Sequence, residues 1–206
     1  METHKQLTIG LFGFGTVGEG LYKILNQTPS LKATIQKVCI RHPHKKRDAP
    51  SELFTTDRDI LLNDPEINVI VEVIDDADAA FQIVSTALRN NKDVVSASKK
   101  MLAEHLPELL KLEQETNKSL LYEASVCASI LIIRNLEEYY DNDLLHSIKA
   151  IVNGSTNFIL TKIFEEGLDF KQALELLARK AGIDIEQYRT TSNRGGPNKE
   201  RIYELL

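Results

Sequence analysis

The sequence predicts an α/β fold in which residues 7 to about 125 form a doubly wound parallel sheet. Two observations predict it. Short runs rich in Val, Ile and Leu alternate with stretches whose apolar residues recur at helical spacing, and the first run leads through a glycine-rich turn into an amphipathic helix. With 206 residues, 42% hydrophobic and 27% charged, the chain is ordinarily globular and can bury a full core.

The expected strands and helices alternate along this part of the chain. Apolar runs predict strands at Leu7–Phe12, Thr34–Ile40, Val69–Ile74, Asp93–Ser96 and Ser119–Tyr122. Helical spacing predicts helices at Thr16–Asn26, Asp57–Leu62, Ala79–Asn90 and Leu102–Thr116, with Thr16, Asp57 and Asp78 at capping positions. Strands that are each followed by a helix are typical of a parallel sheet.

The turn after the first strand has the spacing of a dinucleotide-binding loop, because Gly13, Gly15 and Gly18 follow the pattern Gly-x-Gly-x-x-Gly. The first glycine allows a sharp turn, the second lets the backbone approach a pyrophosphate, and the third lets the helix pack closely on the strand. The helix then offers N–H groups to the phosphates. Such a motif alone is weak, but the flanking strand and helix favour a nucleotide site and a Rossmann-type sheet over a chance glycine turn.

Arg41 stands at the end of the second strand, where dinucleotide choice is made. An acidic residue there binds the ribose hydroxyls of NAD, whereas an arginine accommodates the 2′-phosphate of NADP. No carboxylate occurs before Asp48, and Lys45, Lys46 and Arg47 add positive charge. The pattern favours NADP over NAD as the cofactor. A solvated basic loop is the alternative interpretation.

Lys99 closes the segment Val94–Lys99, an apolar strand that ends in hydroxyl side chains and a lysine. Ligands of open α/β sheets lie beyond the carboxyl ends of the strands, so we expect Lys99 in the crevice that would hold the nicotinamide. A lysine there can orient a substrate oxygen and pass a proton during hydride transfer. The alternative is a lysine that ends a strand at the surface.

Two later segments carry polar candidates. Glu123 follows the fifth strand in a loop of small residues, where backbone carbonyls and a carboxylate would form a cation site built of oxygen atoms. A merely solvated glutamate is the alternative. The segment Asn153–Asn157 starts a helix, and its side chains could serve a polar ligand, although helix capping is the simpler interpretation.

After Tyr122 the pattern becomes that of a second, α+β domain. It predicts a helix at Ile130–Tyr140, a strand at Leu145–Val152, and helices at Phe158–Glu166 and Asp169–Ala181, the last with a capping box of Asp169 and Gln172. From Asp184 the apolar periodicity is lost. A polar, turn-rich stretch leads to an apolar end, which indicates an atypical tail at 184–206 and suggests that something is missing.

Composition excludes several classes of partner. The net charge of −5 argues against a nucleic acid, which needs a concentrated basic face. No apolar run is long enough to span a membrane and no secretory signal is evident, so we expect a cytoplasmic protein. The two cysteines, Cys39 and Cys127, lie far apart in apolar strings and are expected to be reduced core thiols.

Together these motifs resemble those of homoserine dehydrogenases. The resemblance spans residues 7 to 183 and is carried, in the family's order and spacing, by Gly13–Gly18, Val69–Ile74, Val94–Lys99, Tyr122–Ile133 and Asn153–Leu160. It implies NAD(P)-dependent interconversion of L-aspartate 4-semialdehyde and L-homoserine, in threonine and methionine biosynthesis. It also implies an NAD(P)-binding Rossmann domain at 1–128 and a partial catalytic and dimerisation domain at 129–183.

The resemblance further implies roles for individual residues. Cofactor binding would fall to Gly13, Phe14, Gly15, Thr16, Val17, Gly18, Arg41, Ser96 and Lys99. Lys99 would also be catalytic. A monovalent cation such as sodium would be held by Glu123 and the backbone of Val126, Ala128 and Ile130. A homodimer would form through strands near Leu145–Val152 and act on a small-molecule substrate.

Two departures from the family pattern bear on activity. The pair Asp75 and Asp76 replaces two glycines after the third expected strand and adds negative charge close to where the nicotinamide ribose should lie. After Ile183, the family's glutamate and its acid–base Asp–Lys pair do not follow. The sequence is therefore compatible with an impaired homoserine dehydrogenase, with a truncated NADP-binding fragment that has no catalytic activity, or with a small dehydrogenase for another amino acid.

Overall fold

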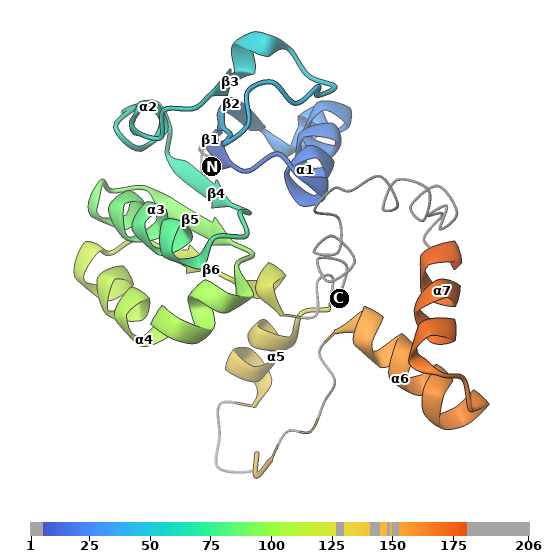
Figure 1. Ribbon diagram of the computed structural model, residues 1–206. Helices are drawn as coiled ribbons and strands as arrows, with labels where there is room; N and C mark the ends of the chain where they lie inside the picture. The colour runs from blue at the N-terminus through green and yellow to red at the C-terminus, as the bar shows by residue number, and fades with distance from the viewer. Residues whose placement is uncertain (1–5, 127–129, 141–144, 148, 150–152, 181–206) are drawn as a thin grey trace. The chain divides into compact units, whose positions relative to one another are not determined.

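The computed structural model describes residues 6–126, 130–140, 145–147, 149 and 153–180 (Figure 1). The contacts divide the chain into two compact units, Met1–Arg134 and Asn135–Leu206. No helix among the described ranges is long and apolar enough to cross a membrane.

The first unit is built on a six-stranded parallel sheet (Figure 1). Its strands, in the spatial order β3-β2-β1-β4-β5-β6, are β1 Leu7–Phe12, β2 Ala33–Cys39, β3 Phe54–Thr55, β4 Val69–Glu72, β5 Asp93–Ser96 and β6 Leu120–Leu121. The order reverses at β1, which pairs with β2 on one side and with β4 on the other. The predicted Rossmann-type sheet is thus confirmed, and its switch point lies where open α/β sheets bind ligands.

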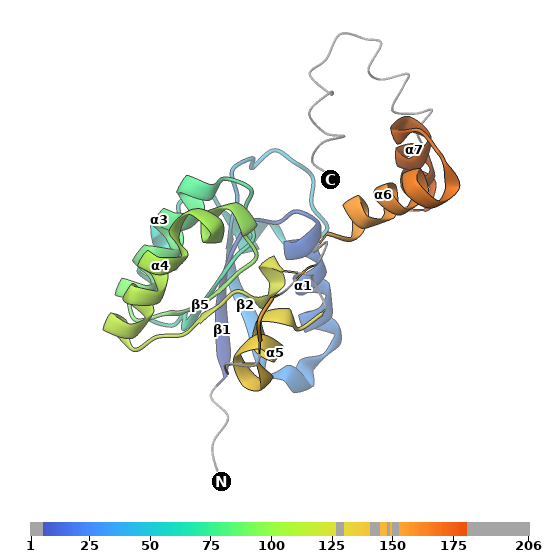
Figure 2. The same ribbon diagram turned by 90° about the horizontal axis from the view of Figure 1, so that it is seen from below.

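Helices cover both faces of this sheet. They are α1 Thr16–Gln27, α2 Asp59–Leu62, α3 Ala77–Arg89 and α4 Lys99–Thr116, with short 3-10 turns η1 Pro29–Leu31, η2 Ser51–Leu53 and η3 Glu123–Ser125. Figure 2 shows α3 and α4 side by side on one face and α1 on the other. A parallel sheet needs this double cover, since its strands are apolar on both sides.

Successive side chains of β1 bury into two separate cores, because they alternate across the sheet. Phe12 packs with Ile70 and Met101 in the core under α3 and α4. Leu11 packs with Val38 and Val71 in the core on the α1 side. Together the two cores hold α1 and α3 against the strands whose carboxyl ends form the crevice.

Lys92 fastens the opposite, amino-terminal edge of the sheet. Its buried ammonium donates to the carbonyl oxygens of Asp64 and Ile67, at 2.5 and 2.7 Å, in the loop that leads into β4. Burial lowers the pKa of this lysine. These hydrogen bonds give the buried ammonium two acceptors and give both carbonyl oxygens a donor, so Lys92 has a structural role. It lies at the opposite end of the sheet from the carboxyl edge.

Several predicted helix starts were wrong. Helix α4 begins at Lys99, three residues earlier than expected, so the lysine belongs to a first helical turn. Asp76 rather than Asp78 caps α3, accepting from the amide of Ala79 at 3.0 Å. Thr16 does not cap α1, because it is already inside the helix and Gly15 is the N-cap. Strand β3 and the 3-10 turns were not predicted, since two or three residues carry no readable period.

The second unit contains the helices α6 Gly154–Glu166 and α7 Phe170–Lys180, while α5 Ile132–Tyr139 crosses the division between the units. Asn153 caps α6 through the amide of Thr156, and Asp169 with Gln172 forms the predicted capping box. Of the predicted strand Leu145–Val152, residues 145–147 and 149 form no strand, and the others lie outside the described residues. Cys127, Ala128 and the tail at 184–206 also lie outside them.

Candidate functional site

The glycine turn joins β1 to α1 at the switch point, and two of its glycines are required by the fold. Gly13 has a φ of +99°, and a Cβ there would lie 2.8 Å from the carbonyl oxygen of Val73. A Cβ on Gly18 would lie 2.3 Å from the carbonyl oxygen of Gly13, which shows how closely α1 packs on the turn. Gly15 differs, because nothing lies within 4 Å of its added Cβ. The fold leaves open space in front of Gly15.

The amino-terminus of α1 faces a hollow that suits an anion. Its N-cap, Gly15, has no side chain to accept from the first-turn amides. The hollow has a volume of about 750 Å³ and is lined by Phe14, Gly15, Thr16, Glu19, Gly20, Lys23, Lys45, Lys46, Arg47 and Asp48. The one carboxylate on α1, Glu19, is paired with Lys23 at 2.6 Å. Helix N–H groups and three basic side chains of one loop therefore line one space, where basic side chains outnumber the carboxylates of Glu19 and Asp48, as a phosphate site requires.

Aromatic contacts hold the basic loop beside the turn. Phe14 is buried and meets the edges of Tyr22 and Phe54, with ring centroids 5.7 and 5.0 Å away. The guanidinium of Arg47 lies over the ring of Phe54 at 5.4 Å and donates to the carbonyl oxygen of Lys45. Buried Phe14 thus packs under the glycine turn and positions the basic loop. Val17, in the first turn of α1, is 59% exposed.

Arg41 lies after β2, as predicted, but it is already paired. Its Nη2 donates to Oδ2 of Asp76 at 2.8 Å, and the two side chains are 68% and 43% exposed. The amide of Ala79 and then Arg41 hold the pKa of Asp76 below its usual range. From the sequence Asp76 was only an added negative charge, because its partner Arg41 lies 35 residues earlier in the chain.

Glu72 is the main functional candidate that sequence reasoning missed. It is the last residue of β4 and is fully buried. Its two oxygens accept from Oγ of Ser96 at 2.6 Å and from the amide of Ile74 at 2.7 Å, and Ser96 in turn accepts from the amide of Ser98. Ser96, a predicted cofactor contact, is therefore held in place by a carboxylate from the neighbouring strand. The signal was a single charged residue inside an apolar run.

Burial raises the pKa of the Glu72 carboxyl above its ordinary value of 4.5, although the bonds from Ser96 and Ile74 oppose the shift. The folded chain holds the proton of Glu72 to higher pH than the unfolded chain does. The contribution of Glu72 to the free energy of unfolding is therefore largest at low pH and is lost as the pH rises through the raised pKa. Glu72→Gln cannot ionise. Its free energy of unfolding, relative to the parent, should therefore rise as the pH increases from the ordinary pKa of the carboxyl through the raised pKa of Glu72. Urea unfolding across this range tests the expectation, and parallel pH curves for the two proteins would contradict it.

Lys99 lies at the same carboxyl edge, three residues beyond the end of β5. It is exposed in the first turn of α4, after a buried Ser98. The amide of Ala97 donates to the carbonyl oxygen of Glu72 at 3.1 Å, which ties the segment before Lys99 to β4. The backbone before Lys99 is therefore anchored to β4, and the exposed side chain starts from the carboxyl edge of the sheet.

In the expected cation loop, the carboxylate of Glu123 accepts hydrogen bonds from the backbone. Both oxygens of Glu123 accept amides near the start of α5, from Ile133 at 3.1 Å and Arg134 at 2.9 Å. The carbonyl oxygen of Ile130 accepts a hydrogen bond from the amide of Ile132. The amide of Val126 donates to the backbone carbonyl oxygen of Glu123. Glu123 therefore stabilises a helix start, and further lone pairs on these oxygens are what a cation would use.

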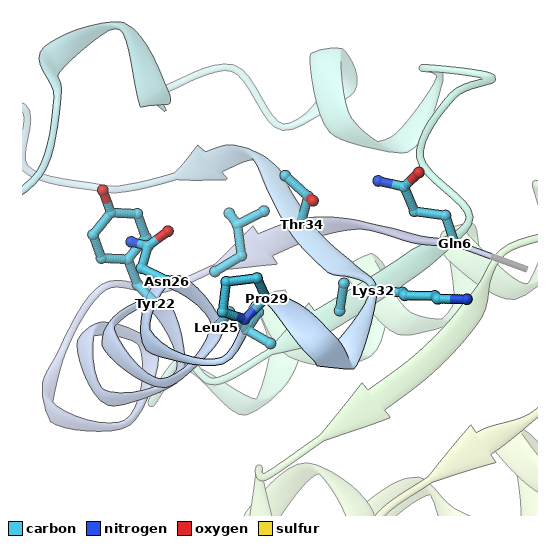
Figure 3. A pocket seen from close by; sticks show the side chains of 9 residues that line it. Gln6, Tyr22, Leu25, Asn26, Pro29, Lys32 and Thr34 are labelled. Atoms are coloured by element: carbon cyan, nitrogen blue, oxygen red, sulfur yellow. The ribbon is translucent and has the colours of Figure 1, made fainter. Parts of the chain in front are cut away.

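A second hollow, of about 550 Å³, lies at the far edge of the sheet (Figure 3). It is lined by Gln6, Tyr22, Leu25, Asn26, Pro29, Lys32, Ala33, Thr34 and Ile35. Lys32 is its one ionic side chain among these. It lies at the amino-terminal end of β2, away from the carboxyl edge that holds the predicted site residues.

Comparison with known proteins decides the family. Residues 13–123, more than half of the chain, match the family model described as homoserine dehydrogenase, NAD binding domain. The chain belongs to the homoserine dehydrogenase family. Residues 132–185 match a further family model, described as homoserine dehydrogenase, so both parts of the chain agree with the resemblance drawn from the motifs.

Individual proteins similar to this chain are also homoserine dehydrogenases. The homoserine dehydrogenase of Bacillus subtilis is 37% identical over 180 residues, which are 83% of this chain and 42% of that protein. The structure of the enzyme from Thiobacillus denitrificans has a TM-score of 0.73 at 29% identity, covering 86% of this chain and 43% of that one. A hyperthermophilic archaeal homoserine dehydrogenase in complex with NADPH has a TM-score of 0.66 at 28% identity, covering 85% and 61%. The chain thus spans less than half the length of the bacterial relatives.

Proposed function

We propose that the protein is an NAD(P)-dependent homoserine dehydrogenase, an oxidoreductase that interconverts L-aspartate 4-semialdehyde and L-homoserine. The observation that carries the proposal is the gathering of the glycine turn, the basic loop and Lys99 at one carboxyl edge, in a chain of this family. The pathway would be that to threonine and methionine.

The cofactor is proposed to be NADP, with NAD as the weaker ligand. The backbone of Gly15, the first turn of α1 and the basic loop beside them would hold the pyrophosphate, and Arg41 would receive the 2′-phosphate. Open space before Gly15 supports this placement. Ser96 would contact the cofactor, fixed by its bond to Glu72.

In the proposed reaction, the bound dinucleotide supplies the hydride acceptor or donor. Lys99 orients the substrate oxygen through its ammonium and passes a proton to or from that oxygen. Glu72 keeps Ser96 and the segment before α4 in place, since it bonds the side chain of one and the backbone of the other. Lys99 therefore acts from a rigid support.

Three further assignments belong to the proposal. Glu123, with backbone carbonyls of Val126, Ala128 and Ile130, would bind a monovalent cation such as sodium, which prefers such oxygen ligands. The family resemblance supports a homodimer formed near Leu145–Val152. A cytoplasmic location agrees with the biosynthetic role. It also agrees with Cys39, a half-buried free thiol whose pKa is raised mainly by burial.

Lys99→Ala should reduce the rate of NADP⁺ reduction by L-homoserine about a hundredfold or more, the usual contribution of a positioned acid–base group. Lys100→Ala is the matched control, because Lys100 is exposed and its ammonium lies 3.9 Å from Glu104 one turn along the helix. Its rate should equal that of the parent. Absorbance of the reduced cofactor follows all three proteins.

The second candidate function is NADP binding without catalysis. It is favoured by the departure of the sequence from the family pattern after Ile183, where the family's acid–base Asp–Lys pair is expected. A parent chain that binds NADP⁺ but shows no homoserine-dependent reduction would support this candidate. Equal rates in the parent and Lys99→Ala would instead remove Lys99 from the mechanism.

A further inference from the structure

The ion pair of Arg41 and Asp76 bridges the segments after β2 and β4 at the carboxyl edge of the sheet. Arg41 follows β2 and Asp76 follows β4, and the sheet order places β1 between these two strands. A contact of 2.8 Å between them must therefore pass over the carboxyl end of β1, where the glycine turn starts at Gly13. In this fold the pyrophosphate sits at the helix start after this turn, and the adenosine ribose is read by the residue after the second strand, where Arg41 lies.

The two partners of this pair are held to different degrees. One oxygen of Asp76 accepts the amide of Ala79 at 3.0 Å and fixes the carboxylate at the start of α3. The bonds from Ala79 and Arg41 lower the pKa of Asp76, so it is charged at neutral pH. Arg41 is the more exposed partner and lies in the loop after β2. A ligand can draw Arg41 away, but it cannot move or neutralise Asp76 as easily.

We propose that Asp76 sets the nucleotide preference of this chain by competing with the 2′-phosphate of NADP for Arg41. This inference rests on the proposed cofactor site. A phosphate that reaches Arg41 must share or break the ion pair and then lies beside a fixed carboxylate, which repels it. NAD carries a hydroxyl there, which is uncharged and can donate to the carboxylate. Asp76 thus narrows the preference for NADP that Arg41 creates.

Neighbouring charges do not replace this effect. Asp75 and Asp78 are exposed and flank the same turn, but the described contacts of Arg41 involve only Asp76 among these carboxylates. The cations Lys45 and Lys46 line the hollow beside the glycine turn and attract either dinucleotide through its pyrophosphate. Selectivity between the two nucleotides therefore depends on the balance between Arg41 and Asp76.

The test compares ligands that differ only in the 2′-phosphate. Calorimetric titrations use 2′-phospho-ADP-ribose and ADP-ribose, which lack the nicotinamide, followed by NADP⁺ and NAD⁺. Asp76→Asn keeps a helix-capping side chain and removes the charge. It should bind the 2′-phosphorylated ligands about five to ten times more tightly, as expected for one neighbouring charge about 4 Å away in water, and the others within about twofold. Asp75→Asn, the matched control, should change neither class by more than about twofold.

The outcomes separate this inference from the proposed function. Unchanged selectivity in Asp76→Asn, or the same gain in Asp75→Asn, overturns the role of Asp76 while the dinucleotide site stands. A parent chain that binds none of the four ligands overturns both. Asp76→Ser provides a second uncharged cap, and thermal unfolding shows that each variant is folded before it is titrated.

Discussion

Gly18→Ala should destabilise the protein by about 3 kcal/mol, the upper range for overpacking a close contact. The added Cβ would lie 2.3 Å from the carbonyl oxygen of Gly13 and 3.4 Å from a methyl of Val73. Backbone cannot give way as a flexible side chain can, so α1 must move off the turn. The same movement displaces the first-turn amides, and nucleotide affinity should be lost along with stability.

Gly20→Ala is the control for this prediction, because it makes the same chemical change two residues further along α1. Nothing lies within 4 Å of its added Cβ. Alanine in a helix interior is more stable than glycine by about 0.5–1 kcal/mol, so this variant should gain stability. Urea unfolding measures both proteins. A Gly18→Ala variant as stable as the parent would show that α1 does not pack on the turn as described.

Gly15→Ala should leave the fold intact and weaken NADP⁺ binding about a hundredfold, the loss expected when a side chain blocks a close backbone approach. As the N-cap of α1, Gly15 has φ −87° and ψ −159°, which alanine adopts without strain. No atom lies within 4 Å of the added Cβ. The free protein has no steric need for this glycine, whereas a pyrophosphate at the helix start would.

The measurement for Gly15→Ala has two parts. Thermal unfolding without ligand should give the same midpoint for the variant and the parent, within about 2 °C on the scale of a small stability change. Titration with NADP⁺ should then separate them. Equal affinity in the two folded proteins would mean that no phosphate approaches this backbone, and the site would have to lie elsewhere.

The sheet and its glycine turn could be predicted because their signals are local. The spacing of Gly13, Gly15 and Gly18 and the apolar run before it lie within a dozen residues. Glu72 was missed for the opposite reason. Its partner Ser96 is 24 residues away on another strand, and only the sheet pairing brings them together. In the sequence, Glu72 is a single charged residue within an apolar run. Its burial makes sense only once the groups that donate hydrogen bonds to it are known.

Details of helix ends and ion pairs also depend on tertiary contacts. Asp76 and Asp78 are both good caps by residue type, and only the backbone geometry of the turn selects Asp76. Arg41 was predicted at the correct strand end, but its partner lies 35 residues further on. Glu123 was placed correctly after the last strand, yet its bonds to the start of α5 could not be inferred from the loop alone.

The central claim is that the carboxyl edge of this sheet binds a nicotinamide dinucleotide, with the pyrophosphate at Gly15. Calorimetric titration of the parent chain with NADP⁺ tests it most directly. We predict saturable binding of one nucleotide for each chain, with weaker binding of NAD⁺. The absence of saturable binding to the folded chain would contradict the account.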